Sequence, residues 1–381
     1  MTINENNSAK LKVSLLSKGI NFNLDLFRNY KKAFYDNQFV YGKTSKYATP
    51  NHKFPQVLLL GDGVITALLR REDSPWNLKI VDQELILLFK DRFIKKVGLP
   101  ERPPYFDKYL RDGTLSQSII AVAGEDIPGF FFYPYCFYFS EGSPCSFCSL
   151  KDTRITVGKH MISEFNEEQI VEATRLFQNT HWRSIPLISI TTGTTKTDED
   201  LRQYVVKPIK IMYDTLDPKI PIHVLAHPPN SFSIIEEFKK AGVTSIAFNL
   251  EIFDKYIFEH ICPGKSKYYS YTKWVESLEY ARYVFGDFNA YCGLVWGFEP
   301  YANIINGYEY FLDKKIGIAS NIWHADPKCI QKNHPHPSEA YILEIAKAQD
   351  ELYSLYPDAK TIFPVSMRST IDWEIYKGFF R

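Results

Sequence analysis

Residues 128–148 of the chain are PGFFFYPYCFYFSEGSPCSFC, and this segment indicates both the fold and the chemistry. Its first part, Pro128–Tyr135, is dominated by aromatic residues and predicts a β-strand. Cys136, Cys145 and Cys148 follow it, so three thiols lie just past the end of one strand. A Cys-x-x-Cys pair with a third cysteine in the same loop can bring three thiolates to one metal centre.

The three cysteines are open to several interpretations. Three thiolates leave one iron of a four-iron cluster without a protein ligand, and a cofactor could bind that iron. Structural zinc usually has four ligands, and His160 is the nearest candidate for the fourth. A thioredoxin-type redox pair would leave Cys136 without a role, and buried cysteines can also be chemically inert. The spacing alone does not decide among these.

Strand-like and helix-like segments alternate from about residue 116 onward. Six strands are predicted, at Pro128–Tyr135, Ile185–Thr191, Ile220–Ala226, Thr244–Leu250, Ala290–Val295 and Gly317–Trp323. Helix ends are recognisable between them: Asn166 precedes an acidic first turn, Ser233 and Glu236 have the spacing of a capping box, and Gly286 follows the last apolar position of a helix. This rhythm implies parallel strands with helices outside them.

The length of the alternating region favours an incomplete barrel, because a closed eight-unit barrel takes roughly 250 residues. We therefore predict an α/β fold, a partial (β/α)6 TIM-like barrel over residues 116–335. Residues 1–115 form a predicted N-terminal accessory α+β region, and residues 336–381 a C-terminal helical extension. In such barrels the reactive groups lie on loops after the strands, where the cysteines are.

Composition limits the classes of partner. Lys and Arg (45) nearly balance Asp and Glu (44), which argues against a nucleic-acid partner. No apolar stretch approaches the roughly 18 residues of a membrane span, and the N-terminus lacks the apolar core of a secretory signal. We therefore expect a cytoplasmic protein with no membrane partner, acting on a small molecule or a peptide.

The cysteine loop and the strand order together resemble the radical S-adenosylmethionine (SAM) superfamily. That family has a three-cysteine loop after the first strand of a partial (β/α)6 barrel, with an aromatic residue before the last cysteine. Phe147 occupies the aromatic position here. The resemblance implies that Cys136, Cys145 and Cys148 hold a [4Fe–4S] cluster. The first two cysteines are separated by eight residues instead of the usual three, a CX8CX2C motif, so the loop must bulge.

Further motifs follow the predicted strands in the family's order. By resemblance, the backbone of Thr192, Gly193 and Thr194 contacts the amino group of SAM, and Asn249 and Glu251 contact its ribose or methionine end. The resemblance implies three further cofactor-binding residues. Lys265 could bind a carboxylate, and Val295 and Gly297 would lie along the adenine side of SAM.

The resemblance implies an enzyme in which the reduced cluster passes one electron to SAM. Cleavage then yields a 5'-deoxyadenosyl radical that abstracts hydrogen from the substrate. Such an oxygen-sensitive enzyme needs an external one-electron reductant such as flavodoxin or ferredoxin.

Two alternatives remain open, and one further group of residues is a candidate for the substrate pocket. The chain could be a non-catalytic zinc-binding barrel, or Cys262, Cys292 and Cys329 could bind a second cluster used for sulfur insertion. The side chains that could line the substrate pocket are His324, Asp326, His334 and His336.

Overall fold

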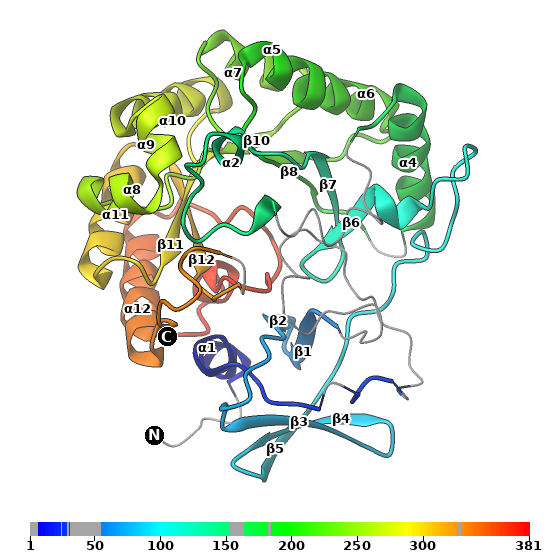
Figure 1. The fold of residues 1–381 in the computed structure, drawn as a ribbon, viewed down its shortest axis with the longest axis vertical. Coiled ribbons are helices and arrows are strands. Elements are labelled where there is room, and N and C mark those ends of the chain that lie inside the picture. The colour runs from blue at the N-terminus through cyan, green and yellow to red at the C-terminus, as the bar shows by residue number, and fades with distance from the viewer. Residues whose placement is uncertain are drawn as a thin grey trace.

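The computed structural model of the chain describes residues 7–23, 25–28, 30, 55–151, 164–181, 184–326 and 329–381. Its centre is a seven-stranded sheet (Figure 1). In spatial order the strands are β6 (Ile120–Ala123), β7 (Ile127–Tyr133), β8 (Ile188–Thr192), β9 (Ile222–Leu225), β10 (Ser245–Ala247), β11 (Ala290–Trp296) and β12 (Gly317–Ile322). Strands β7 to β12 are parallel to one another, and β6 is antiparallel to β7. The six predicted parallel strands are confirmed.

Helices follow the strands and surround the curved sheet on its outer side (Figure 1). They are α4 (Glu167–Thr180), α5 (Asp198–Leu201), α6 (Lys207–Thr215), α7 (Ser233–Lys240), α8 (Lys255–Ile261), α9 (Pro263–Tyr269), α10 (Tyr271–Phe285), α11 (Tyr301–Asp313) and α12 (Glu339–Leu355). Two short helices lie elsewhere: α2 (Phe137–Ser140) belongs to the segment after β7, and α13 (Asp372–Tyr376) packs against α12. A π-helical turn, η2 (Arg202–Val206), joins α5 to α6. The α/β class and the partial TIM-like barrel are therefore confirmed.

Both faces of the central strands are covered, which explains their nearly continuous apolar sequences. Every residue of β11 is buried. Val295 faces the interior of the barrel, where it lines a cavity. Its neighbour Trp296 points outward, and its indole Nε1 donates a 2.7 Å hydrogen bond to the hydroxyl of Tyr308 in α11. The alternation of side chains along a strand thus separates an inner surface from a helix-packing surface.

Helix ends agree with the sequence in one case and differ in another. Asn166 caps α4 and forms a reciprocal capping box with Gln169. The capping box predicted at Ser233 and Glu236 is wrong, because Phe232 is the N-cap residue and Ser233 lies inside α7. The Ser233 hydroxyl pairs with that of Ser231 at 2.8 Å.

The N-terminal region has its own small core. It consists of α1 (Ser8–Lys18), the hairpin β1 (Val57–Gly61) and β2 (Val64–Ala67), and an antiparallel sheet of β3 (Trp76–Val81), β4 (Glu84–Phe89) and β5 (Arg92–Val97). Trp76 and Leu87 belong to this core, whereas Val57 and Ile65 join the core of the barrel. The expected accessory α+β region is present, and its boundary at residue 115 stays a prediction.

Residues 362–370, which we call the C-terminal strap, lie between the barrel and the hairpin. The strap accepts a 2.8 Å hydrogen bond from the Ala67 amide at the Arg368 carbonyl, and another 2.8 Å bond from the Ile322 amide at the Ser369 carbonyl. It therefore joins β2 to β12, the last strand of the parallel series. This contact covers one side of the barrel with a segment that belongs to none of the β-α units.

A buried ion pair joins α1 to α13, and its lysine also binds the strap. Lys12 Nζ lies 2.7 Å from Glu374 Oε1, and neither side chain is exposed. Lys12 also donates to the Ser366 hydroxyl at 3.1 Å and to the Met367 carbonyl at 2.6 Å. Burial lowers the pKa of Lys12, and the Glu374 carboxylate opposes that effect.

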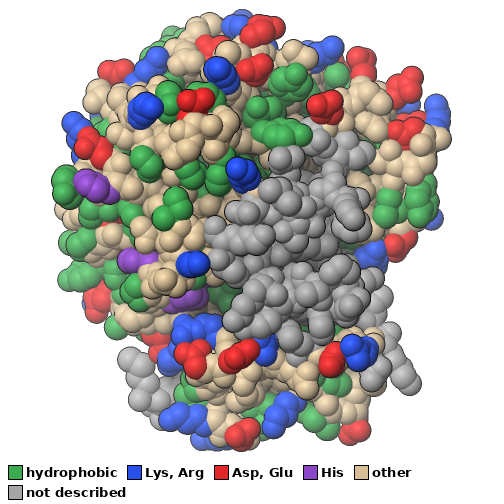
Figure 2. Space-filling model, in the orientation of Figure 1, with side chains coloured by type: hydrophobic (Ala, Val, Ile, Leu, Met, Phe, Trp, Pro, Cys, Tyr) green, Lys and Arg blue, Asp and Glu red, His purple; other side chains and the backbone are tan. Residues whose placement is uncertain are grey.

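No described helix has the length and apolarity needed to cross a membrane. Acidic and basic side chains are interspersed over the face of the described part that Figure 2 shows.

The Lys12→Met variant should lose about 3–5 kcal/mol of unfolding free energy, because it leaves the Glu374 carboxylate buried without its counter-charge. Urea denaturation measures this loss. The Lys12→Met/Glu374→Leu double variant should regain part of it, since no charge is then left buried alone. A Lys12→Met variant as stable as the parent chain would show that the ion pair does not stabilise the fold.

Candidate active site

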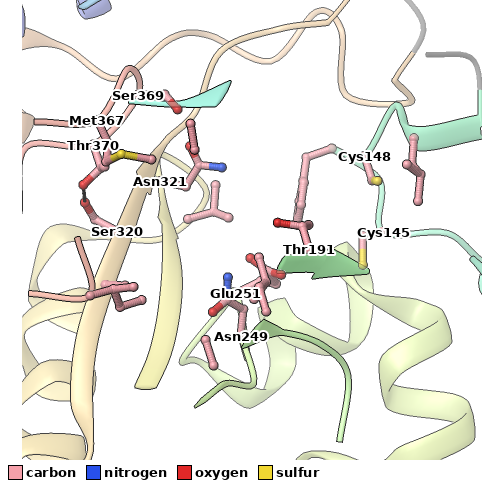
Figure 3. A pocket seen from close by; sticks show the side chains of 18 of the residues that line it. Cys145, Cys148, Thr191, Asn249, Glu251, Ser320, Asn321, Met367, Ser369 and Thr370 are labelled. Carbon is pink, nitrogen blue, oxygen red and sulfur yellow. Dashed lines mark hydrogen bonds between the residues drawn. The ribbon is translucent and has the colours of Figure 1, made fainter. Parts of the chain in front are cut away.

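A cavity of about 360 Å³ lies inside the curved sheet, a volume usual for small-molecule sites. Cys136, Cys145 and Cys148 form part of its wall. Side chains at the ends of the parallel strands form another part, and the C-terminal strap closes the side opposite Cys145 and Cys148 (Figure 3). The three cysteines, which come from one segment, thus face the same enclosed space as the strand ends.

The cysteine segment, residues 136–148, begins directly after β7. Cys136 is the N-cap residue of α2, and the following residues form this single helical turn. The chain then returns, with a 2.9 Å hydrogen bond from the Ser143 amide to the Tyr138 carbonyl. A further turn, closed by a 2.9 Å bond from the Cys148 amide to the Cys145 carbonyl, brings the last two cysteines together. The expected bulge is therefore an ordered helical turn.

The end of β8 is bonded to the cysteine segment through the backbone. The Gly193 amide donates to the Tyr133 carbonyl and the Phe137 amide donates to the Thr194 carbonyl, both at 2.8 Å. A Cβ atom on Gly193 would lie 1.6 Å from the Tyr135 carbonyl oxygen. Glycine is required here because a neighbouring backbone occupies the position of its missing side chain.

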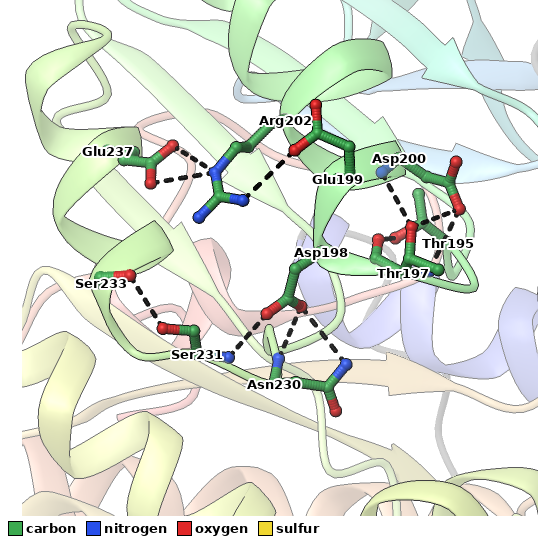
Figure 4. A network of polar contacts seen from close by, with 10 residues as sticks. All are labelled: Thr195, Thr197, Asp198, Glu199, Asp200, Arg202, Asn230, Ser231, Ser233 and Glu237. Carbon is green, nitrogen blue, oxygen red and sulfur yellow. Dashed lines mark hydrogen bonds and ion pairs between the residues drawn. The ribbon is translucent and has the colours of Figure 1, made fainter.

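A polar network fixes the loop that continues from this glycine (Figure 4). Thr197 and Asp200 form a capping box at the start of α5. The Asp198 carboxylate accepts 2.8 Å hydrogen bonds from the amides of Asn230 and Ser231, which follow β9. The loops after β8 and β9 are therefore held together at the rim of the cavity.

Gly193→Ala should lower the unfolding free energy by about 1–3 kcal/mol, the usual cost of overpacking. The reason is that the backbone at the end of β8 must move away from the cysteine segment. Thermal unfolding and iron content after anaerobic reconstitution measure the effect. The matched control is Gly98→Ala, whose Cβ would make ordinary 3.4 Å contacts with Leu59. Equal stability of the two variants would show that the close contact is unimportant.

The end of β10 contributes a buried ion pair. Lys265 Nζ lies 2.9 Å from Glu251 Oε1, donates to the Asn249 carbonyl at 2.7 Å, and stands 4.5 Å from the centre of the Trp274 ring. Burial alone would lower the pKa of Lys265, but Glu251 and Cys145 raise it above its usual value. Glu251 has a left-handed backbone with φ of 76°, and its carbonyl accepts a 2.7 Å bond from the Val295 amide. A fixed positive charge thus lies on the cavity wall near Cys145.

If Lys265 binds SAM, as the resemblance implies, Lys265→Met should weaken SAM binding roughly tenfold or more, because it removes a charged donor and leaves Glu251 uncompensated in the cavity. Isothermal titration with SAM measures the affinity. The control is Lys240→Met, which removes an exposed lysine 3.9 Å from Glu236. Unchanged affinity in Lys265→Met would remove Lys265 from the cofactor site.

The three thiols differ in their electrostatic surroundings. A hydrogen bond from the Cys262 thiol, followed by the charge of Lys265, lowers the pKa of Cys145. Burial raises the pKa of Cys136 and of Cys148. Because thiolates and not thiols bind metals, these surroundings favour the metal-binding form of Cys145 over those of Cys136 and Cys148.

These residues fit an iron–sulfur cluster better than a single ion. Among the described residues, no three His, Cys, Asp or Glu side chains are close enough together to enclose one metal ion. Each thiolate of a four-iron cluster binds a different iron, so the cluster needs sulfurs that share a cavity without converging on a point. Cys136, Cys145 and Cys148 have that arrangement. His160, the suggested zinc ligand, lies outside the described residues.

Most of the other predicted cofactor residues line the same cavity. They are Phe147, Thr192, Gly193, Thr194, Asn249, Glu251, Lys265 and Val295. Gly297 is the exception among the predicted residues. Its left-handed φ of 126° places the Cα against Pro337 and Trp323 instead. Its amide donates to the Tyr341 hydroxyl at 3.2 Å, so it connects β11 to α12.

Some cavity residues were not predicted from the sequence. The strap supplies Phe363, Met367 and Arg368. His227, after β9, is a cavity residue whose Nδ1 atom has no hydrogen-bond partner in the described part of the chain. Burial lowers the pKa of His227 to about 4, so the ring is neutral. A lone histidine carries no signal in the sequence that would distinguish it from a surface residue.

The candidates for the substrate pocket divide into two pairs. His324 and Asp326 line the cavity. His334 instead stacks on Phe298 with ring centres 4.6 Å apart. His336 Nε2 accepts a 3.4 Å bond from the Ala325 amide. Neither His334 nor His336 is among the residues that line the cavity.

Comparison with known proteins identifies the family. Residues 132–296 match the model of the Radical SAM superfamily, a range that runs from the end of β7 to the end of β11 and includes all three cysteines. Residues 132–296 therefore form a radical SAM domain. Members of that superfamily are enzymes that use a [4Fe–4S] cluster and SAM.

The chain is 25% identical over 265 residues to the bacteriochlorophyllide c C-7(1)-hydroxylase of Chlorobaculum limnaeum, a match that covers 65% of each chain. It thus spans slightly less than two thirds of that relative. Among solved structures, the [FeFe]-hydrogenase maturase HydG is similar with 14% sequence identity and a TM-score of 0.47, and the match covers 70% of this chain and 56% of HydG. The coproporphyrinogen III oxidase HemN of Escherichia coli is similar with 12% sequence identity and a TM-score of 0.41, and the match covers 68% of this chain and 58% of HemN.

Proposed function

We propose that the chain binds a [4Fe–4S] cluster through Cys136, Cys145 and Cys148 and uses it to cleave SAM reductively. The observation that carries the proposal is that these cysteines share one cavity with the residues that follow β8, β10 and β11. When bound, the two cofactors supply a one-electron cleavage of SAM to a 5'-deoxyadenosyl radical, which abstracts hydrogen from the substrate. An external one-electron donor such as flavodoxin or ferredoxin would supply the electron.

The protein's own residues would bind and orient SAM. The backbone at Thr192–Thr194 is held rigidly against the cysteine segment, so it can present amide groups to the amino acid end of the cofactor. Lys265 is a fixed cation for a carboxylate, and Glu251 is a fixed anion beside it. Phe147 and Val295 add apolar wall. These elements hold a charged molecule in place and exclude water from it.

The substrate that we propose is a small organic molecule. The name of the relative from Chlorobaculum limnaeum describes hydroxylation of bacteriochlorophyllide c, which favours a small organic molecule over a peptide. Apolar residues from the strap and from β12 would enclose the substrate beside the cofactor.

The alternatives are less well supported. Cys262 contacts Cys145, Cys292 lies in the core outside the cavity, and Cys329 packs with Trp323. Within the described part of the chain these cysteines do not form a metal-binding group. None of the three lines the cavity, so they do not share that space for a second cluster, and no set of zinc ligands lies among the described residues.

Cysteine variants test the proposed function directly. After anaerobic reconstitution, the parent chain should hold iron and sulfide and release 5'-deoxyadenosine from SAM under a strong reductant. Substituting Ala for Cys136, Cys145 or Cys148 should remove most of the iron and all of this release, because each cysteine binds a separate iron. Cys292→Ala, which removes a thiol outside the cavity, should retain both. A parent chain that takes up zinc and no iron would refute the proposal.

A further inference from the structure

A second sulfur lies next to Cys145, outside the cavity. Cys262 ends α8 and starts α9, and its side chain is completely buried in the core of the barrel. Cys145 lines the cavity, whereas Cys262 does not. Cys262 therefore lies outside the space that a cluster would fill, but it can act on a cluster through Cys145.

Contacts on both sides of this pair fix the two segments against each other. The Ser146 amide donates a 2.8 Å hydrogen bond to the Ile261 carbonyl, and the Ser146 hydroxyl donates to the same oxygen at 3.2 Å. On the other side, a Cβ atom on Gly264 would lie 2.4 Å from the Ser143 carbonyl oxygen. Residues 143–146 thus run along residues 261–264, and Cys145 and Cys262 stand opposite each other between these contacts.

The side chains of the two cysteines are hydrogen-bonded to each other. As an iron ligand, Cys145 must be a thiolate, which accepts hydrogen bonds. Cys262 is then the donor, because a thiol in apolar surroundings keeps its proton. The Cys262 amide is already used, since it donates to the Phe258 carbonyl at 2.8 Å. The interaction with Cys145 is thus made by the thiol.

Hydrogen bonds to ligand sulfurs change the reduction potential of an iron–sulfur cluster. Reduction adds negative charge to the cluster and its thiolates, so a donor at a ligand sulfur stabilises the reduced form more than the oxidised form. Removing such a donor therefore lowers the potential. The charge of Lys265 also acts on both sulfurs, and it stays in place when the residue at position 262 is changed.

We propose that Cys262 is a positioning residue for the cluster: its thiol donates a hydrogen bond to the Cys145 sulfur and raises the reduction potential, so that an external donor reduces the cluster more easily. This inference rests on the proposed function, since Cys145 must bind the cluster. It gives Cys262 a role other than that of a ligand to a second cluster.

A redox titration of the cluster tests the proposal. The parent chain and Cys262→Ala are reconstituted anaerobically, and the reduced cluster is followed by electron paramagnetic resonance as the applied potential is lowered. At the midpoint potential of the parent chain, the ratio of reduced to oxidised cluster should be about three- to tenfold lower in the variant, because one hydrogen bond to a charged sulfur is lost. A tenfold change corresponds to about 59 mV for a one-electron couple.

Three further variants separate the hydrogen bond from packing. Cys262→Val removes the donor but fills the space, so it should show the same shift even if Cys262→Ala does not fold. Cys262→Ser retains a donor and should restore at least half of the shift. Cys292→Ala removes another fully buried thiol, which lies 3.9 Å from the Gly293 carbonyl, and should have the potential of the parent chain.

A parental potential in both Cys262→Ala and Cys262→Val would overturn the proposal, as would an equal shift in Cys262→Ser or Cys292→Ala. Loss of iron from the Cys262 variants would also overturn it, because Cys262 would then be a ligand. Iron content and 5'-deoxyadenosine release of the parent chain are measured on the same samples. If the parent chain shows neither, the proposed function fails and the role of Cys262 with it. If it shows both and the potentials agree, only the role of Cys262 fails.

Discussion

The close approach of the β8 end to the cysteine segment is the constraint on which the rest of the site depends. Gly193 permits it, because any side chain there would overlap the Tyr135 carbonyl. A second glycine acts from the other side: a Cβ on Gly264 would lie 2.4 Å from the Ser143 carbonyl oxygen. The Ser146 amide is also bonded to the Ile261 carbonyl at 2.8 Å. The cysteine segment is thus clamped between the loops that follow β8 and β10.

This clamping explains why the unusual spacing of the cysteines is compatible with the site. The extra residues between Cys136 and Cys145 form α2, and the chain returns after a single helical turn. The positions of the thiols are set by the two contacts at the ends of the segment, not by the number of residues between them. A segment of different length could make the same contacts if its additional residues also formed a turn between the first two cysteines.

The sequence predicted the parts of the structure that depend on local patterns. All six parallel strands follow from apolar runs, and the cysteines were correctly placed after the first of them. The short strand β6 was missed because four residues, Ile120–Ala123, carry too little periodicity. The strap could not be predicted, since its contacts join residues far apart in the chain: Lys12 and Met367 are separated by 355 positions. The cofactor role that the resemblance gives Gly297 stays a prediction; in the structure its amide donates to the Tyr341 hydroxyl.

The same difference between local and distant contacts separates the two walls of the cavity. The wall that carries the predicted cofactor residues is made by strand ends and the loops directly after them, so the parallel sheet itself fixes their relative positions. The opposite wall is made by the strap, the hairpin and β12, which long-range hydrogen bonds and a buried ion pair hold together. Substitutions in the strap can change what the second wall binds without moving the strand ends. Under the proposed function, a barrel of this kind could keep its radical chemistry while its substrate changes, because the two walls depend on different sets of contacts.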